Sequence, residues 1–413
     1  MIRYSPAVIK KKILATAALT LGLLAATAGP AAADPLDDAW QAQRGNALPR
    51  TSFYDPPTPL PWAPGGTLIR QQDTTEYALG AATRLLYHSR TSDGRDVAAS
   101  GVLVVPAGQA PAGGWPVVLY AHGASGIARD CAPSLMRDLY HGDQIQRFVT
   151  AGYAVVAPDY AGMGTTGRPE LVNKTSEAYD LRYGLRAAYR ARSDLARQWT
   201  VWAHSQGGGA ALGMAEQLVR TPEPGYRGMV VTSPAADLPA LFDHVVETPG
   251  YGAFGVLLPA GAHNSDPRIR LDRILTTEAL NRLATIQDGC LGVASVAYAD
   301  LTGEALIRPD QDDPRFARYL RVNSTGDRPV AGPILLLQGD ADTVTPSALT
   351  DGVAASLCAT GSDVDYRVYP GLEHDSYPQW GVVGIDDGAA TVILTWIGER
   401  FADRPTTPTC QGM

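Results

Sequence analysis

The chain has 413 residues, a formal net charge of −8 and four cysteines. This length is ample for a large hydrophobic core without disulfide staples. The acidic balance argues against nucleic acid or an anionic membrane surface as the main partner, so we expect no nucleic-acid partner.

The first 33 residues have the pattern of a secretory signal peptide. Lysines at 10–12 precede an apolar stretch at 13–28, and Ala31, Ala32 and Ala33 follow before Asp34. Small residues at these positions predict cleavage after Ala33 and a secreted, extracellular protein. The apolar stretch is short for a membrane span and is rich in Ala and Gly. Removal of its four basic residues would change the formal charge from −8 to −12.

The cysteines predict two disulfides, because their number is even and the expected compartment is oxidising. Three pairings exist, and we favour Cys131–Cys290 with Cys358–Cys410. No C-x-x-C pair occurs, which argues against a redox or zinc motif.

Residues 34–65 are rich in proline and predict an extended N-terminal arm without regular elements. Strand-like runs at 82–91 and 97–106 flank Ser92-Asp93-Gly94 and predict an antiparallel hairpin.

From residue 115 the pattern alternates between strands and helices. The continuous apolar runs are typical of strands buried on both faces. We expect an α/β fold of the α/β-hydrolase type, with a mostly parallel central sheet and helices on both faces. The expected strands are at 115–121, 153–158, 199–203, 226–233, 333–338 and 365–369, and the expected helices at 177–197, 208–219, 347–358 and 388–401.

The alternation stops over residues 236–330, a segment too long to be a loop of a compact domain. It contains an apolar stretch at 251–259 and helical runs near 272–288 and 314–320. We interpret it as a helical cap inserted into a core made of residues 66–235 and 331–413, the second of which includes a C-terminal tail.

Ala203-His204-Ser205-Gln206-Gly207 lies between an apolar strand and a helix rich in Ala and Gly. This is the pattern of a nucleophile elbow, in which small residues at −2 and +2 permit a sharp turn that exposes the serine. Ser205 is therefore the candidate nucleophile.

A serine hydroxyl needs a base, and the base needs a carboxylate to orient it. His374 follows the last predicted strand, and the other histidines fit this role less well; His204 should point away among the surroundings of the sheet. Asp342 and Asp340 compete as the carboxylate after the strand at 333–338. We favour Asp342 for its place in the turn, and Asp340 then bonds local backbone. The order Ser, Asp, His is that of α/β-hydrolases.

The oxyanion of an acyl-transfer intermediate needs two N–H donors. One is expected from Gln206, and the other from Ala124 in the loop after the first parallel strand, with Gly123 as the alternative. His122 is expected to be structural. No cofactor is required by this chemistry, and no cluster of His, Cys and Asp in the sequence suggests a metal.

With these motifs placed, the chain resembles the secretory lipase family, the lipase-A-like α/β-hydrolases, and especially its actinobacterial members. The resemblance spans residues 66–402. It rests on Ala121-His-Gly-Ala-Ser-Gly126, Cys131-Ala-Pro133, Pro158-Asp-Tyr-Ala-Gly162, His204-Ser-Gln-Gly-Gly208, Pro234-Ala-Ala-Asp-Leu238, Gln338-Gly-x-x-Asp342 and Tyr369-Pro-Gly-x-x-His374.

The resemblance implies a lipase or esterase that cleaves carboxylic esters through an acyl-enzyme, with Ser205, Asp342 and His374 as its triad. Its partner would be a small-molecule or lipid ester, met in part at a lipid–water interface. Ala203 at the elbow and a polar cap favour shorter acyl chains.

Two alternatives remain at this point. A peptidase with the same triad would need a carboxylate for the peptide amine, and the cap offers Asp237, Asp243 and Glu247. A binding protein without catalytic activity could also keep this fold.

Overall fold

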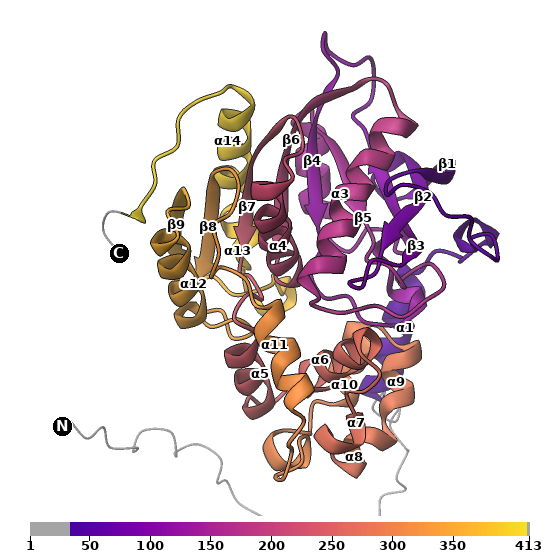
Figure 1. Ribbon diagram of the computed structural model, residues 1–413, viewed down its shortest axis with the longest axis vertical. Helices are drawn as coiled ribbons and strands as arrows, with labels where there is room; N and C mark the ends of the chain where they lie inside the picture. The colour runs from indigo at the N-terminus through magenta and orange to yellow at the C-terminus, as the bar shows by residue number, and fades with distance from the viewer. Residues whose placement is uncertain (1–33, 411–413) are drawn as a thin grey trace, which may run out of the picture. The chain divides into compact units, whose positions relative to one another are not determined.

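The computed structural model describes residues 34–410, so the predicted signal peptide lies outside the described residues. Their main feature is a nine-stranded sheet with the order β1-β2-β3-β5-β4-β6-β7-β8-β9 (Figure 1). The strands are β1 (Leu68–Tyr77), β2 (Gly80–Arg90), β3 (Asp96–Val104), β4 (Trp115–Ala121), β5 (Ala154–Pro158), β6 (Leu195–His204), β7 (Tyr226–Thr232), β8 (Ile334–Gly339) and β9 (Val364–Tyr369).

The predicted hairpin is β2 and β3, which pair antiparallel around Gly94 at a φ of 85°. The other pairs are parallel from β5 through β4 to β9, while β1–β2 and β3–β5 are antiparallel. The sheet is therefore mostly parallel, as predicted. β1 was not predicted, because its sequence is largely polar and it lies at the sheet edge with only its last residue buried.

Helices cover both faces of the sheet (Figure 1). One face packs against α3 (Lys174–Ala191), α4 (Gln206–Arg220) and α12 (Ser347–Ala359). The other packs against α2 (Gly142–Thr150) and α14 (Ala390–Phe401). Alternate residues of one strand serve the two cores: Val117 and Leu119 face the first, and Val118 and Tyr120 the second. This explains why the strands read as continuous apolar runs.

Between β7 and β8 the chain forms helices that gather below the sheet in Figure 1 and have a hydrophobic core of their own. Thr276 caps a new helix inside the run that we had expected near 272–288, so that run consists of three short helices. The helices are α5 (Leu238–Glu247), α6 (Gly252–Ser265), α7 (Leu271–Ile274), α8 (Thr277–Asn281), α9 (Leu283–Asp288), α10 (Leu291–Ala297) and α11 (Pro314–Asn323). We keep the name cap for this segment; its boundaries at 236 and 330 stay a prediction.

The N-terminal arm differs from its prediction. It begins with a helix, α1 (Pro35–Asn46), and contains a short 3-10 helix at Ser52–Tyr54. The first turn contains Pro35, a residue favoured at the start of a helix. The helix dipole is stabilised by Asp37 and Asp38 in the first turn and by Arg44 in the last. α1 packs against α10 of the cap, so a tertiary contact stabilises a helix that composition did not indicate.

Both favoured disulfides are confirmed. Cys131–Cys290 joins the loop after β4 to the start of α10, and Cys358–Cys410 joins α12 to the C-terminal segment. Across residues 34–410, no helix has both the length and the apolar character that a bilayer span requires.

Candidate active site

Ser205 lies at the sharp turn between β6 and α4. Its φ of 54° and ψ of −119° are strained for a residue with a side chain, which is the expected conformation of an elbow. The turn is fixed by backbone bonds, because Ser205 N–H donates to Thr232 O at 3.0 Å and Ala235 N–H donates to Ser205 O at 2.9 Å. Gly207 is required at +2, since a Cβ there would lie 1.9 Å from the backbone oxygen of Ala121.

Asp342 lies in the turn after β8, and five donors surround its buried carboxylate. Oδ1 accepts from the N–H groups of Val344 at 2.9 Å and Thr345 at 2.7 Å. Oδ2 accepts from Gln338 Nε2 at 3.0 Å, Thr345 Oγ1 at 2.9 Å and the Nδ1 of His374 at 2.9 Å. Burial alone would raise the pKa of Asp342, but the charge and hydrogen bond of His374 and the other donors outweigh it and lower that pKa.

The structure pairs His374 with Asp342 and not with Asp340. Asp340 is exposed, and its Oδ1 accepts from the backbone N–H of Gly371 at 2.6 Å. We had expected a bond to local backbone, but this partner lies in the turn after β9 and is brought close by the pairing of β8 with β9. His374 is buried, and its Nδ1 faces Asp342. Within the described residues, neither its Nε2 nor the hydroxyl of Ser205 forms a hydrogen bond.

The ring of His204 places His374 beside the elbow. Its ring centroid lies 4.6 Å from that of His204, the residue before Ser205. The three candidate residues thus come from the carboxyl-terminal side of β6, β8 and β9, which is where active sites of such sheets form.

The backbone expected to form the oxyanion hole lies against the elbow. A Cβ on Gly123 would be 3.5 Å from the Cβ of Ser205, so this loop and the serine are in direct contact. In the described part of the chain, the N–H groups of Gln206 and Ala124 donate no backbone or side-chain hydrogen bond, which leaves both free for a ligand. Two tyrosine hydroxyls hold the loop, because Tyr140 donates to Ala124 O at 2.6 Å and Tyr160 donates to His122 O at 3.0 Å.

His122 contacts the backbone of its own loop. It is fully buried, which lowers its pKa to about 3, and its Nδ1 lies 2.7 Å from Gly123 O. The side chain of Gln206 is held as well, because its Nε2 donates to Oε1 of buried Glu177 at 2.6 Å.

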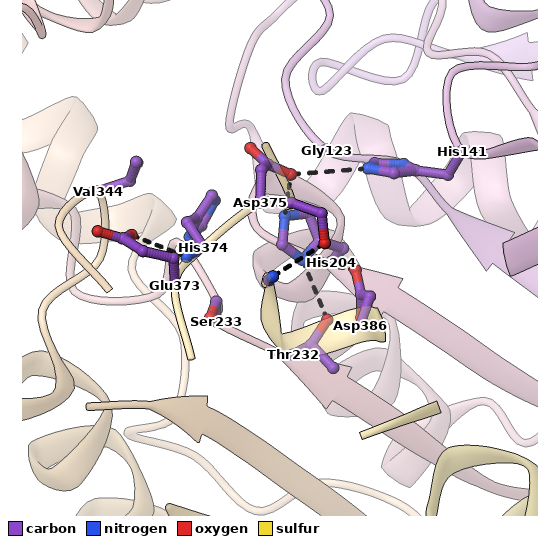
Figure 2. Close-up of polar contacts among 12 residues, drawn as sticks. Gly123, His141, His204, Thr232, Ser233, Val344, Glu373, His374, Asp375 and Asp386 are labelled. Atoms are coloured by element: carbon purple, nitrogen blue, oxygen red, sulfur yellow. Dashed lines mark hydrogen bonds and ion pairs between the residues drawn. The ribbon is translucent and has the colours of Figure 1, made fainter. Parts of the chain in front are cut away.

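Sequence reasoning missed an ionic cluster beside His374, in which His204 and Asp386 are buried and the side chain of Asp375 is 40% exposed. His204 does not point away from the site: its Nδ1 lies 3.0 Å from Oδ2 of Asp386, and its Nε2 lies 3.5 Å from Oδ1 of Asp375 (Figure 2). His141, at the start of α2, places Nε2 3.9 Å from the same Asp375 oxygen. His204 and Asp375 directly adjoin Ser205 and His374 in sequence, a signal that could have been used; Asp386 has no such signal.

These residues also form two groups with the ligand types of a metal site. The ligand atoms of His141, His204 and Asp386 lie within 4.8 Å of one another, and so do those of His204, His374 and Asp375. Both groups share His204, whose two nitrogens already face carboxylates. A metal bound to a His204 nitrogen would have to displace the proton which that nitrogen donates to a carboxylate.

The chain has relatives among known proteins. The chain is 26% identical over 386 residues to a Mycobacterium tuberculosis protein named as a probable inactive lipase, a match that covers 86% of this chain and 82% of the relative.

Two solved structures have similar folds. Lipase A of Candida antarctica matches with a TM-score of 0.73 and 17% identity, covering 88% of this chain and 89% of that one. The rice cell wall degrading esterase LipA of Xanthomonas oryzae matches with a TM-score of 0.65 and 18% identity, covering 82% and 97%.

The family model of the secretory lipases matches residues 140–409, which include Ser205, Asp342 and His374. The match extends over more than half of the chain and includes strands β5 to β9, the elbow and the cap. The chain therefore belongs to the secretory lipase family.

Proposed function

We propose that this protein is an extracellular hydrolase of carboxylic esters that works through an acyl-enzyme on Ser205. The observation that carries the proposal is the 2.9 Å contact between Nδ1 of His374 and the buried carboxylate of Asp342, next to a serine on a strained elbow. This contact fixes the imidazole with its proton on Nδ1 and leaves Nε2 as the base.

The reaction follows from these positions. Nε2 of His374 removes the proton of Ser205 as its oxygen attacks the ester carbonyl carbon, and Asp342 stabilises the resulting imidazolium. The N–H groups of Gln206 and Ala124 stabilise the oxyanion, and the imidazolium then protonates the departing alcohol. Water, activated by His374 in turn, releases the acid from Ser205. The base must come within hydrogen-bond reach of the hydroxyl, a bond that often tightens only when substrate is present.

The substrate class is an ester of a small molecule or lipid, with a shorter acyl chain. Family membership supports ester hydrolysis, and the fold is shared with a lipase and with an esterase. Ser205 is 8% exposed and His374 4%, so a substrate has to reach a largely covered serine.

Labelling with a fluorophosphonate probe, together with hydrolysis of nitrophenyl esters from acetate to palmitate, tests the proposal. Wild-type protein should be labelled and should turn over the butyrate, and Ser205→Ala should lose both activities. Ser125→Ala is the matched control, because this buried serine lies in the neighbouring loop and donates to Cys131 O at 2.8 Å.

A second candidate is a binding protein without catalysis, which is favoured by the name of the mycobacterial relative. It predicts no labelling of a folded wild-type protein and no turnover of any ester. If an aminoacyl nitroanilide were cleaved faster than the butyrate ester, a peptidase would replace the esterase.

A further inference from the structure

The cluster of His204, Asp375 and Asp386 lies inside the candidate site, and the proposed reaction does not use it. We propose that His204 is a positioning residue: as a buried imidazolium clamped between Asp375 and Asp386, it holds the loop of His374 against the elbow and sets the charge that His374 experiences. This inference rests on the proposed function, because it assigns a role within the same site.

The clamp joins three segments that are distant in sequence. His204 ends β6 and precedes Ser205, Asp375 follows His374, and Asp386 lies in α13 (Ile385–Gly388). One side chain therefore ties the elbow to the loop that carries the base and to the helix behind it. Figure 2 shows His204 at the centre, with His374 on one side and His141 on the other.

The surroundings indicate a charged His204. The residue is 2% exposed, and each of its ring nitrogens faces a carboxylate. Burial alone would lower its pKa, but Asp386 and Asp375 raise it to about 10. Burial raises the pKa of Asp386, and the His204 imidazolium outweighs this effect and lowers it. The pKa of Asp375 is lowered as well, but its side chain is 40% exposed, so solvent screens this carboxylate more strongly.

Further polar side chains lie around the clamp. The hydroxyl of Thr232 lies 3.1 Å from Nδ1, and Asp386 also accepts from Trp202 Nε1 at 3.3 Å. The ring of His141 lies 5.4 Å from that of His204, between centroids, and its Nδ1 is bonded to the hydroxyl of Tyr120.

The clamp carries one net negative charge, from two carboxylates and one imidazolium. Because the His204 ring lies 4.6 Å from the ring of His374, this charge acts on the protonation of the base. Loss of the positive charge should favour the imidazolium form of His374, and loss of one carboxylate should oppose it. A merely structural role predicts no such opposite effects.

The test is the acid limb of the kcat/KM profile against pH for nitrophenyl butyrate, which reports the protonation of the free base. His204→Gln should move its midpoint up and Asp375→Asn should move it down, each by about one pH unit for a unit charge near 6 Å at an effective dielectric constant of about 40. The double variant restores one net negative charge and should return the midpoint to within about a third of a unit of the wild-type value. Asp387→Asn is the control, because this carboxylate in the same helix pairs with Arg147 at 2.9 Å and not with His204.

NMR of labelled histidine rings provides a readout that does not depend on catalysis. The His204 ring of wild-type protein should remain an imidazolium up to pH 8, and the His374 titration should shift between variants in the directions given above. Titration of His204 near pH 6.5 would overturn the clamp, as would shifts of the same sign in both single variants. Metal analysis completes the test. If the purified protein contained bound zinc and the His204 signals changed on dialysis against EDTA, His204 would bind a metal and not a proton, and the clamp would be overturned. If no ester were turned over but the NMR titrations of His204 and His374 behaved as expected, only the proposed function would be refuted, and the clamp would stand.

Discussion

Replacement of Asp342 by Asn tests the pairing on which the proposed reaction depends. The carboxylate stabilises the His374 imidazolium that forms as Ser205 attacks, and the two groups are in contact at 2.9 Å. Unit charges centred about 4 Å apart interact by about 4 kcal/mol at an effective dielectric constant of about 20. Since each 1.4 kcal/mol corresponds to a factor of about ten, kcat should fall about 10³-fold.

The assay is steady-state hydrolysis of nitrophenyl butyrate, with circular dichroism to establish that the variant is folded. KM should change little, because Asp342 is separated from the substrate by the imidazole. Asp340→Asn is the matched control, since it removes the same charge from an exposed side chain two residues before Asp342. That side chain accepts from the backbone N–H of Gly371 at 2.6 Å and does not contact His374. An Asp342→Asn variant with more than a tenth of wild-type kcat, or an Asp340→Asn variant with the larger loss, would refute the assignment.

Three further predictions concern stability, each measured by denaturant unfolding. Gly207→Ala should lower the free energy of unfolding by about 3 kcal/mol or more, because the new Cβ would lie 1.9 Å from a backbone oxygen of β4. Gly292→Ala is the control, because a Cβ there would have nothing within 4 Å. Equal losses in the two variants would contradict the reasoning. Burial raises the pKa of Asp180 to about 8, so folded protein holds a proton that the unfolded chain releases, and stability falls as pH rises between about 4 and 8. Asp180→Asn should remove up to about 1.4 kcal/mol per pH unit of that slope, and an unchanged slope would count against it. Replacing Cys131 and Cys290 together by Ser should cost about 5 kcal/mol, because the bridge closes a separation of 159 residues; a loss below about 1 kcal/mol would show that the bridge constrains little.

Much of the candidate site could be predicted because its chemistry is local in sequence. The elbow needs a strand, a serine and small neighbours within a few residues, and the run from Ala203 to Gly207 has them. The two acidic candidates were separable for the same reason: Asp340 is closest to the strand end, and Asp342 lies in the turn beyond it. The pairing with His374 then agreed with the order in the chain.

The misses have a common physical origin. α1 is a helix because it packs against α10, a contact that residues 34–65 alone cannot reveal. β1 has little apolar pattern because it lies at the edge of the sheet and buries few side chains. His204 was expected to point away from the site, and the structure turns it towards Asp375 and Asp386.

The sequence by itself determined the alternation of buried strands and helices, the elbow at Ser205 and the identity of the residues available as base and acid. These depend on hydrophobic period and on backbone sterics, which act over a few residues. Tertiary structure decided which carboxylates surround which imidazoles, because Asp375 and Asp386 meet His204 only once β6, the loop after β9 and α13 are packed together. A charge acts through distance in space and through the removal of water, and neither is set until the chain is folded.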